Sequence, residues 1–357
     1  MKKLLSLLLI LLTSLNMLPQ IKLEVTKEEQ NQMLNEADDW IDEMPESRQD
    51  HMSDAIVHAM RGFNSEIHNY RGDNKIKKES SVLSIKNLKG GKNQDINMRL
   101  YESSGKNPKK SDLPLLIYFH GGVWSMGSLE SSDHFCQTLA ESGKIKIVSV
   151  EYPLAPESPY PAALNKCIEA IEYIATKSND WGFNQSLISV GGDEAGGNLA
   201  ISSLVKLNEK QASNPRIKSL VLYYPILNPQ IDKTKPSWRK YGRGYGLDSR
   251  LLESGGLAYV GGMSGNIDPS LYDNPLVTNL NLSISQLALL PPVLIIEAGR
   301  DLLIEWEDDF VTSLKKAGNK TTRINFTGAI NGFISDGNQP SAFKKAIQIT
   351  ESFLLQK

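Results

Sequence analysis

Short apolar runs alternate with longer amphipathic segments along most of this chain. The apolar runs are typical of buried strands, and they occupy residues 115–119, 145–150, 187–190, 220–225, 293–298 and 322–326. Segments with apolar residues at helical spacing lie between or after them, at 129–142, 162–176, 199–207, 306–317 and 341–355. Strands that alternate with helices predict an α/β fold with a mostly parallel central sheet and helices on both faces.

Other patterns precede and interrupt this alternation. Residues 82–85 and 96–101 alternate apolar and polar positions, which predicts an antiparallel hairpin. Two amphipathic helices are expected at 24–44 and 50–70. Residues 227–290 are rich in Gly, Tyr, Trp, Pro and Ser and carry only short helical patches, so they form an insertion between strands.

The N-terminal helical segment, residues 21–78, and the insertion at about 227–290 have two interpretations. They form a lid over a site, or they are ordinary surface packing. The aromatic residues of the insertion also have two interpretations: they line an apolar pocket, or they pack as part of an ordinary insertion. These residues are Trp238, Tyr241, Tyr245 and Tyr259.

Residues 1–20 begin with a short positive region, followed by a Leu/Ile run at 4–12. This pattern indicates a secretory signal peptide, with an uncleaved signal anchor as the alternative. Both predict the secretory pathway, with the chain secreted or in the lumen of the endoplasmic reticulum, and membrane contact only through the anchor. Glycosylation sequons agree with that route at Asn184, Asn281 and Asn319, whereas the sequon at Asn325 lies in an expected strand.

Composition limits the kinds of binding partner and cofactor that we expect. A formal net charge of −2 gives no electrostatic reason to expect nucleic acid. The two cysteines, Cys136 and Cys167, fall in successive helices that are expected on opposite faces of the sheet, so no disulfide is predicted. We expect neither a metal nor a cofactor, and the oligomeric state stays open.

The stretch at 192–198 reads Gly-Asp-Glu-Ala-Gly-Gly-Asn and joins a short β-branched run to a helical one. A strand-to-helix turn with glycines around one exposed residue is the geometry of the nucleophile elbow, G-x-S-x-G. Here the central residue is Glu194 and not serine.

Five motifs occur in an order that resembles the hormone-sensitive-lipase-like (GDXG) group of α/β-hydrolases, which includes carboxylesterases and arylacetamide-deacetylase-like proteins. They are residues 120–122 (resembling HGGG), 152–157 (YRLAPE), 192–198 (GDSAGGN), 301–303 (DPL) and 331–333 (HGF). The resemblance implies an α/β-hydrolase domain at 79–357 and an ancestry in carboxylic ester hydrolysis.

The same resemblance assigns the site residues. Glu194 stands at the nucleophile position, Asp301 at the triad acid and Asn331 at the triad base. The oxyanion-hole positions are Gly122, Val123 and Ala195, and the neighbouring motif positions that would contribute to binding are His120, Gly121 and Asp193.

The triad is degenerate in this assignment. Asn331 cannot accept a proton near neutral pH, and none of the five histidines lies beyond His134. We therefore predict a non-catalytic member with a pocket for a small lipophilic ester or acid, in which the Glu194 carboxylate fills the oxyanion pocket. Two alternatives stay open: an active hydrolase that uses Glu194 with Asp301, and a secreted interaction protein without a ligand.

Overall fold

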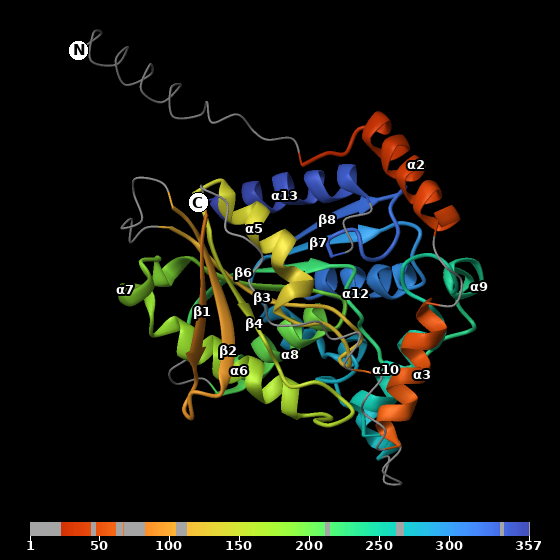
Figure 1. Ribbon diagram of the computed structural model, residues 1–357, viewed down its shortest axis with the longest axis horizontal. Coiled ribbons are helices and arrows are strands. Elements are labelled where there is room, and N and C mark those ends of the chain that lie inside the picture. Colours follow the sequence, from red (N-terminus) through yellow and green to blue (C-terminus); the bar gives the residue numbers. More distant parts are fainter. Residues whose placement is uncertain are drawn as a thin grey trace.

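An eight-stranded sheet forms the centre of the molecule (Figure 1). The computed structural model describes residues 23–43, 48–61, 67, 83–104, 113–210, 215–261, 268–335 and 339–356, so the expected signal segment lies outside the described residues. In spatial order the strands are β1 (Leu83–Gly90), β2 (Ile96–Ser103), β4 (Lys146–Val150), β3 (Leu115–Phe119), β5 (Ile188–Asp193), β6 (Ile217–Tyr223), β7 (Val293–Ala298) and β8 (Thr321–Phe326).

The strand pairing confirms the predicted α/β-hydrolase fold and its N-terminal hairpin. β1 pairs antiparallel with β2, and β2 pairs antiparallel with β4. The other neighbours are parallel from β4 to β8. Phe119 at the end of β3 is level with Gly192 near the end of β5, so the residues that follow these two strands meet at one edge of the sheet.

Helices cover both faces of the sheet. The longer helices are α2 (Lys27–Glu43), α3 (Arg48–Met60), α5 (Asp133–Glu141), α6 (Ala162–Ala175), α8 (Glu194–Lys210), α10 (Ser249–Tyr259), α12 (Ile304–Lys316) and α13 (Pro340–Leu355). Shorter pieces are α7 (Ser178–Trp181), α9 (Pro236–Tyr241), α11 (Ile284–Ala288), η1 (Leu129–Ser132), η2 (Gln185–Leu187), η3 (Pro269–Asp273) and η4 (Asn279–Asn281). Figure 1 shows α5 and α13 on one side of the sheet and α6 and α8 on the other.

The period of two along each strand divides the core into two layers. Ile117 and Phe119 of β3 pack with α6, α8 and α12, whereas Leu116 and Tyr118 pack with α5 and α13. The two cysteines follow the same division: Cys136 lies in one layer and Cys167 in the other, and both are buried free thiols. The prediction of no disulfide between them is confirmed.

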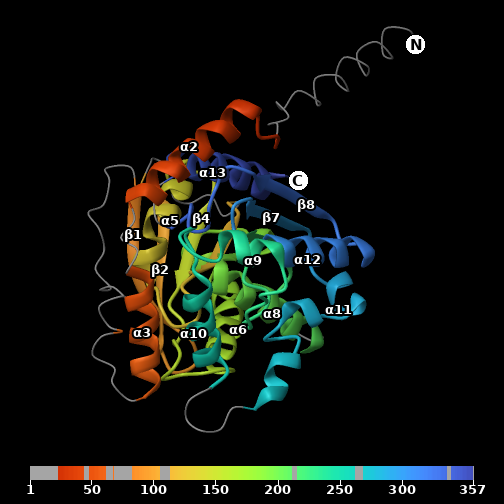
Figure 2. The ribbon, with the colours of Figure 1, turned by 90° about the vertical axis from the view of Figure 1, so that its right-hand side faces the viewer.

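The two N-terminal helices take different positions (Figure 2). α2 packs on α13, where Lys345 Nζ lies 2.9 Å from a Glu29 oxygen and the Ser341 N–H donates to Glu36 at 2.9 Å. α3 lies beside α10 of the insertion. α3 ends at Met60 and Arg61 is in a turn, and most of the remaining part of the helix expected over 50–70 lies outside the described residues.

Stacking within the insertion answers the question about its aromatic residues. The Trp238 ring packs on Trp306 with centroids 5.1 Å apart, and Tyr259 stacks on Trp124 at 4.6 Å. Tyr241 and Tyr245 contact each other at 5.0 Å. These side chains therefore pack among themselves and against the domain.

No helix within the described part of the chain is long and apolar enough to cross a bilayer.

Candidate functional site

The elbow between β5 and α8 is fixed by two glycines that a larger residue cannot replace. A Cβ atom on Gly192 would lie 2.5 Å from the Phe119 carbonyl oxygen, and one on Gly196 would lie 2.0 Å from it. Real Cβ atoms do not approach backbone so closely, so only glycine lets α8 start directly against β3. Glu194 itself has φ = +45°, a strained left-handed conformation that a tight elbow imposes on its central residue.

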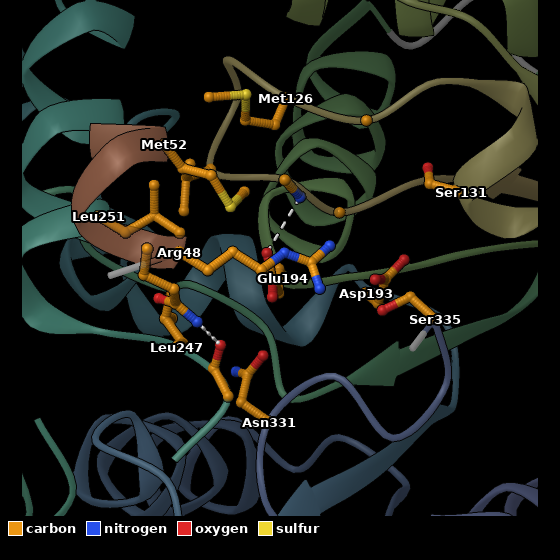
Figure 3. A pocket seen from close by; sticks show the side chains of 16 residues that line it. Arg48, Met52, Met126, Ser131, Asp193, Glu194, Leu247, Leu251, Asn331 and Ser335 are labelled. Atoms are coloured by element: carbon orange, nitrogen blue, oxygen red, sulfur yellow. Dashed lines mark hydrogen bonds between the residues drawn. The ribbon is translucent and has the colours of Figure 1, made fainter. Parts of the chain in front are cut away.

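The Glu194 carboxylate points back over the loop that follows β3. Its Oε2 atom accepts a hydrogen bond from the Gly122 N–H at 3.0 Å (Figure 3). Gly122 is one of the positions expected from sequence to provide an oxyanion donor. A carboxyl oxygen thus lies at a position expected from sequence to stabilise developing negative charge.

Asp193, next to Glu194, is buried and hydrogen-bonded within the domain. It is 3% exposed, and its Oδ1 atom accepts from the Tyr118 hydroxyl at 2.7 Å. Its other oxygen leaves no room for a side chain at Gly121 in the neighbouring loop, since a Cβ there would lie 2.5 Å from Asp193 Oδ2. The carboxyl group therefore helps to shape the loop that carries the Gly122 N–H.

His120 is packed under the loop that carries Gly122, and burial favours the neutral form of its ring. Its ring stacks on Tyr152 with centroids 4.3 Å apart, and the Tyr152 hydroxyl donates to the His120 carbonyl oxygen at 2.7 Å. Burial lowers the pKa of His120 to about 4, against a smaller opposing effect from its contact with the Gly121 carbonyl. His120 does not line the cavity described below, so it lies out of reach of a substrate there.

Val123 stands in an unusual conformation for a β-branched residue, with φ = +45°. Its side chain is buried against α10, where a Cβ on Gly255 would lie 2.6 Å from the Val123 Cβ. The missing side chain at Gly255 therefore makes room for Val123. The next residue, Trp124, is also left-handed at φ = +60° and carries the stack with Tyr259.

The remaining triad positions meet behind the elbow. The Asn331 Nδ2 atom donates to Asp301 Oδ2 at 2.8 Å, and the Leu303 N–H donates to Asp301 Oδ1 at 3.1 Å. Burial raises the pKa of Asp301 to about 7, and these hydrogen bonds only partly oppose the shift. An amide thus stands at the position expected from sequence to hold the triad base.

More carboxyl groups lie buried near Asp301. Glu307 of α12 is fully buried, and neither of its carboxyl oxygens has a hydrogen-bond partner within the described residues. Burial, followed by the charges of Glu297 and Asp301, raises the pKa of Glu307 well above its usual value. Burial also raises the pKa of Glu297 to about 7, although Arg323 Nε lies 2.8 Å from both of its oxygens. No group of three or more His, Cys, Asp or Glu in the described ranges is arranged to hold a metal ion.

A cavity of about 230 Å³ lies over the elbow (Figure 3). It gathers six of the positions expected from sequence, namely Gly121, Gly122, Val123, Asp193, Glu194 and Asn331, whereas Ala195, His120 and Asp301 do not line it. Its apolar walls come from Met52 of α3, Met126 of the loop after β3, and Leu247 and Leu251 of the insertion. The lid interpretation thus applies to α3 and the insertion, while α2 contributes no lining residue.

Two cavity residues at the start of α3 were not expected from sequence. Gln49 is buried; its Oε1 atom accepts from the Asp248 N–H at 2.8 Å and its Nε2 atom donates to the Gly246 carbonyl. Arg48 extends across the cavity toward Glu194 (Figure 3). The polar pair at a helix start was the available signal, but nothing local in the sequence indicates which distant loop it meets.

The glycosylation candidates differ in their surroundings. Asn281 is exposed, and Asn184 is half-buried with its side-chain oxygen accepting from the Ser186 N–H. Asn319 is also half-buried, and its Nδ2 atom, to which a glycan would attach, donates to the Leu290 carbonyl at 2.9 Å. Asn325 lies in β8, as expected.

Comparison with known proteins agrees with this architecture. A family model described as alpha/beta hydrolase fold matches residues 116–335. The chain is 28% identical over 322 residues to Lipase 2 of a Moraxella species, covering 83% of this chain and 71% of that protein. It is 29% identical over 227 residues to a carboxylesterase of Mycobacterium tuberculosis, covering 63% and 68%.

Solved structures show the same fold. A carboxyl esterase from the fungus Tuber melanosporum superposes with a TM-score of 0.69 at 23% identity, over 80% of this chain and 89% of that one. A thermostable esterase from Pseudomonas putida gives 0.68 at 19% identity, over 92% and 95%.

Fold and site together define an α/β-hydrolase. The chain belongs to the hormone-sensitive-lipase-like family of α/β-hydrolases and is similar to the carboxylesterases and lipases of that family.

Proposed function

We propose that this chain is a non-catalytic member of its esterase and lipase family, and that it keeps the family's cavity to bind a small ligand with an apolar part. The observation that carries the proposal is the Glu194 carboxylate. It stands at the nucleophile position and accepts the Gly122 N–H at 3.0 Å, so one side chain replaces the nucleophile and also fills an oxyanion position.

The absence of a base supports the same proposal. Acyl transfer through a serine-type mechanism needs a nucleophile, a base within hydrogen-bond reach and oxyanion donors. Asn331 donates to Asp301 and has no basic nitrogen. Of the histidines in the described ranges, none lines the cavity; these are His51, His58, His120 and His134.

The buried position of Asp301 weighs against an active site built from two carboxylates. Such a site needs both groups to face one substrate at a defined separation. Glu194 lines the cavity, but Asp301 is fully buried and lies behind Asn331. The geometry therefore favours binding without turnover.

The testing experiment restores the missing groups. Hydrolysis of p-nitrophenyl acetate and butyrate is measured for the wild type, Glu194→Ser, and Glu194→Ser/Asn331→His. We expect no turnover by the wild type. We expect the double variant to exceed Glu194→Ser alone by about 10²-fold, because a positioned general base contributes about 10²–10⁴-fold.

Glu194→Ser/Asn331→Gln is the matched control, since it restores the hydroxyl without a base. It should remain at the level of Glu194→Ser. Turnover by the wild type that Glu194→Gln abolishes would show that Glu194 is itself a working catalytic group and would overturn the proposal.

A further inference from the structure

Three carboxyl side chains at the β7–α12 junction are fully buried: Glu297 of β7, Asp301 of the connecting loop and Glu307 of α12. Asp301 accepts hydrogen bonds at both oxygens, and both Glu297 oxygens lie 2.8 Å from Arg323 Nε. Neither Glu307 oxygen has a hydrogen-bond partner within the described residues. A buried carboxylate without a partner costs far more free energy than a buried carboxylic acid, so this site favours the protonated form of Glu307.

The charges around Glu307 oppose the loss of its proton. The negative groups that act on it are Glu297, Asp301 and Asp308. Arg323 is the positive group that opposes them, and its guanidinium already contacts two of the three. Of the other elements at α12, α11 and η4 carry no charged residue, and Lys235 at the start of α9 pairs with Asp309 at 3.0 Å. An ionised Glu307 therefore adds a negative charge opposite a guanidinium that is already paired.

The insertion docks on the same junction through α9, which lies beside the start of α12 (Figure 2). The Ser237 hydroxyl contacts the Leu302 carbonyl oxygen at 2.9 Å and Glu305 Oε2 at 2.6 Å. The Trp238 ring packs on Trp306 in the first turn of α12. α9 therefore rests on the helix turn that carries the buried, partnerless carboxyl group.

The turn between α9 and α10, residues 242–248, makes a second contact with this region. A Cβ on Gly246 would lie 2.1 Å from the Asn331 carbonyl oxygen, so the turn lies directly against the residue that donates to Asp301. Gly246 and the next residue, Leu247, line the cavity over the elbow. A movement at the β7–α12 junction thus reaches the cavity wall through α9 and through Asn331.

We propose that the β7–α12 junction is a pH-sensitive latch, which holds α9 and the turn at 242–248 against the domain while Glu307 is protonated and releases them as the pH rises. The latch is independent of the proposed function, because it requires neither a ligand nor turnover. Burial raises the pKa of Glu307 well above its ordinary value of 4.5, so the docked state binds the proton more tightly than an exposed carboxyl group does. Docking is therefore complete below pH 4.5 and weakens as the pH rises toward the raised pKa.

Hydrogen exchange measured by mass spectrometry on the full chain tests the latch at pH 5, 6, 7 and 8, with labelling times scaled for the intrinsic pH dependence of exchange. In the wild type, the protection of amides at 236–248 should fall by up to about tenfold per pH unit, the limit for one proton released on opening. Amides of α8 are the internal reference and should keep their protection. An equal fall in α8 would mean that the whole domain loosens, and this result would overturn the latch.

Two variants remove the titrating group. Glu307→Gln replaces the carboxyl group by an amide, and Glu307→Met replaces it by an apolar side chain of similar length. Both should keep at pH 8 the protection that the wild type shows at pH 5, whereas Glu141→Gln, on the exposed side of α5, should follow the wild type. Circular dichroism verifies folding, and either folded variant decides the test alone. Protection that falls as steeply in the folded variants as in the wild type, or that does not change with pH in the wild type, overturns the proposal.

Discussion

Two strand-to-helix junctions, β5–α8 and β7–α12, both carry carboxyl groups, and they hold them in opposite ways. At the first, Glu194 is half-buried, lines a cavity and receives a backbone N–H. At the second, Asp301 and Glu307 are fully buried, and Glu307 has no hydrogen-bond partner for either oxygen within the described residues. The first junction holds a carboxyl group that reaches a cavity and a backbone N–H, whereas the second buries its carboxyl groups, and burial raises their pKa values.

This difference predicts different sensitivities. The β5–α8 junction depends on close packing, because Gly192 and Gly196 lie against the Phe119 carbonyl. The β7–α12 junction depends on pH, because burial raises the pKa of Asp301 to about 7 and that of Glu307 in the same direction. Gly196→Ala and Glu307→Gln each change one of these two junctions.

The largest effect is expected from Gly196→Ala. The new Cβ would lie 2.0 Å from the Phe119 carbonyl oxygen and 2.5 Å from that of His120, so α8 must move away from β3. We expect the free energy of unfolding to fall by about 3 kcal/mol or more, at the upper end for overpacking. Urea denaturation measures this loss.

Gly318→Ala is the control for backbone conformation alone. Unlike Gly196, Gly318 has a positive φ, +75°, and nothing lies within 4 Å of its added Cβ. We expect a loss of roughly 1–2 kcal/mol there from the left-handed conformation. Equal losses for the two variants would show that close packing does not set the elbow.

A pH-dependent effect is expected from Glu307→Gln. Glu307 has a folded-state pKa raised above its unfolded value of 4.5, so the folded protein binds the proton more tightly than the unfolded chain. Its contribution to stability is complete below pH 4.5 and is lost as pH rises toward the folded pKa. The variant should therefore gain stability relative to the wild type by up to about 1.4 kcal/mol per pH unit above pH 4.5.

Urea denaturation at pH 5, 6, 7 and 8 measures this difference. Glu141→Gln, which removes an exposed carboxyl group from α5, should follow the wild-type profile at every pH. A constant difference between Glu307→Gln and the wild type across the series would contradict the assignment of a buried, proton-binding carboxyl group.

The smallest effect is expected from the charges that hold α3 at the surface. Arg250 pairs with Asp50 at 3.0 Å and also contacts Asp54, and its side chain is 50% exposed. Arg250→Ala should lower the free energy of unfolding by no more than about 1 kcal/mol at low salt, and by less in 1 M NaCl.

Gln49→Ala removes the buried contacts of the same helix to Gly246 and Asp248. It should cost about 1–3 kcal/mol, because it leaves polar backbone groups without partners, and salt should not change this cost. A salt-dependent loss for Gln49→Ala would mean that surface charge and not the buried amide holds α3 in place.

The sequence predicted the strands of the sheet and the positions of the elbow because both are local properties. Periodicity identified the buried strands, and glycine spacing identified the turn at Glu194. The walls of the cavity were not predictable in this way. Gln49 meets Gly246 and Asp248, which are about 200 residues away, through contacts that exist only in the folded chain. The aromatic residues of the insertion had no local signal that separates packing from lining.

The contact between Val123 and Gly255 has a consequence for the order in which this site could change. A Cβ on Gly255 would lie 2.5 Å from the Val123 carbonyl oxygen and 2.6 Å from the Val123 Cβ. Replacing Val123 by glycine first leaves a void, whereas enlarging Gly255 first creates a clash, so the two substitutions are not additive. Because the carbonyl oxygen of residue 123 remains after such a replacement, glycine at 123 alone does not admit a larger residue at 255, and the void must be filled by another part of the chain.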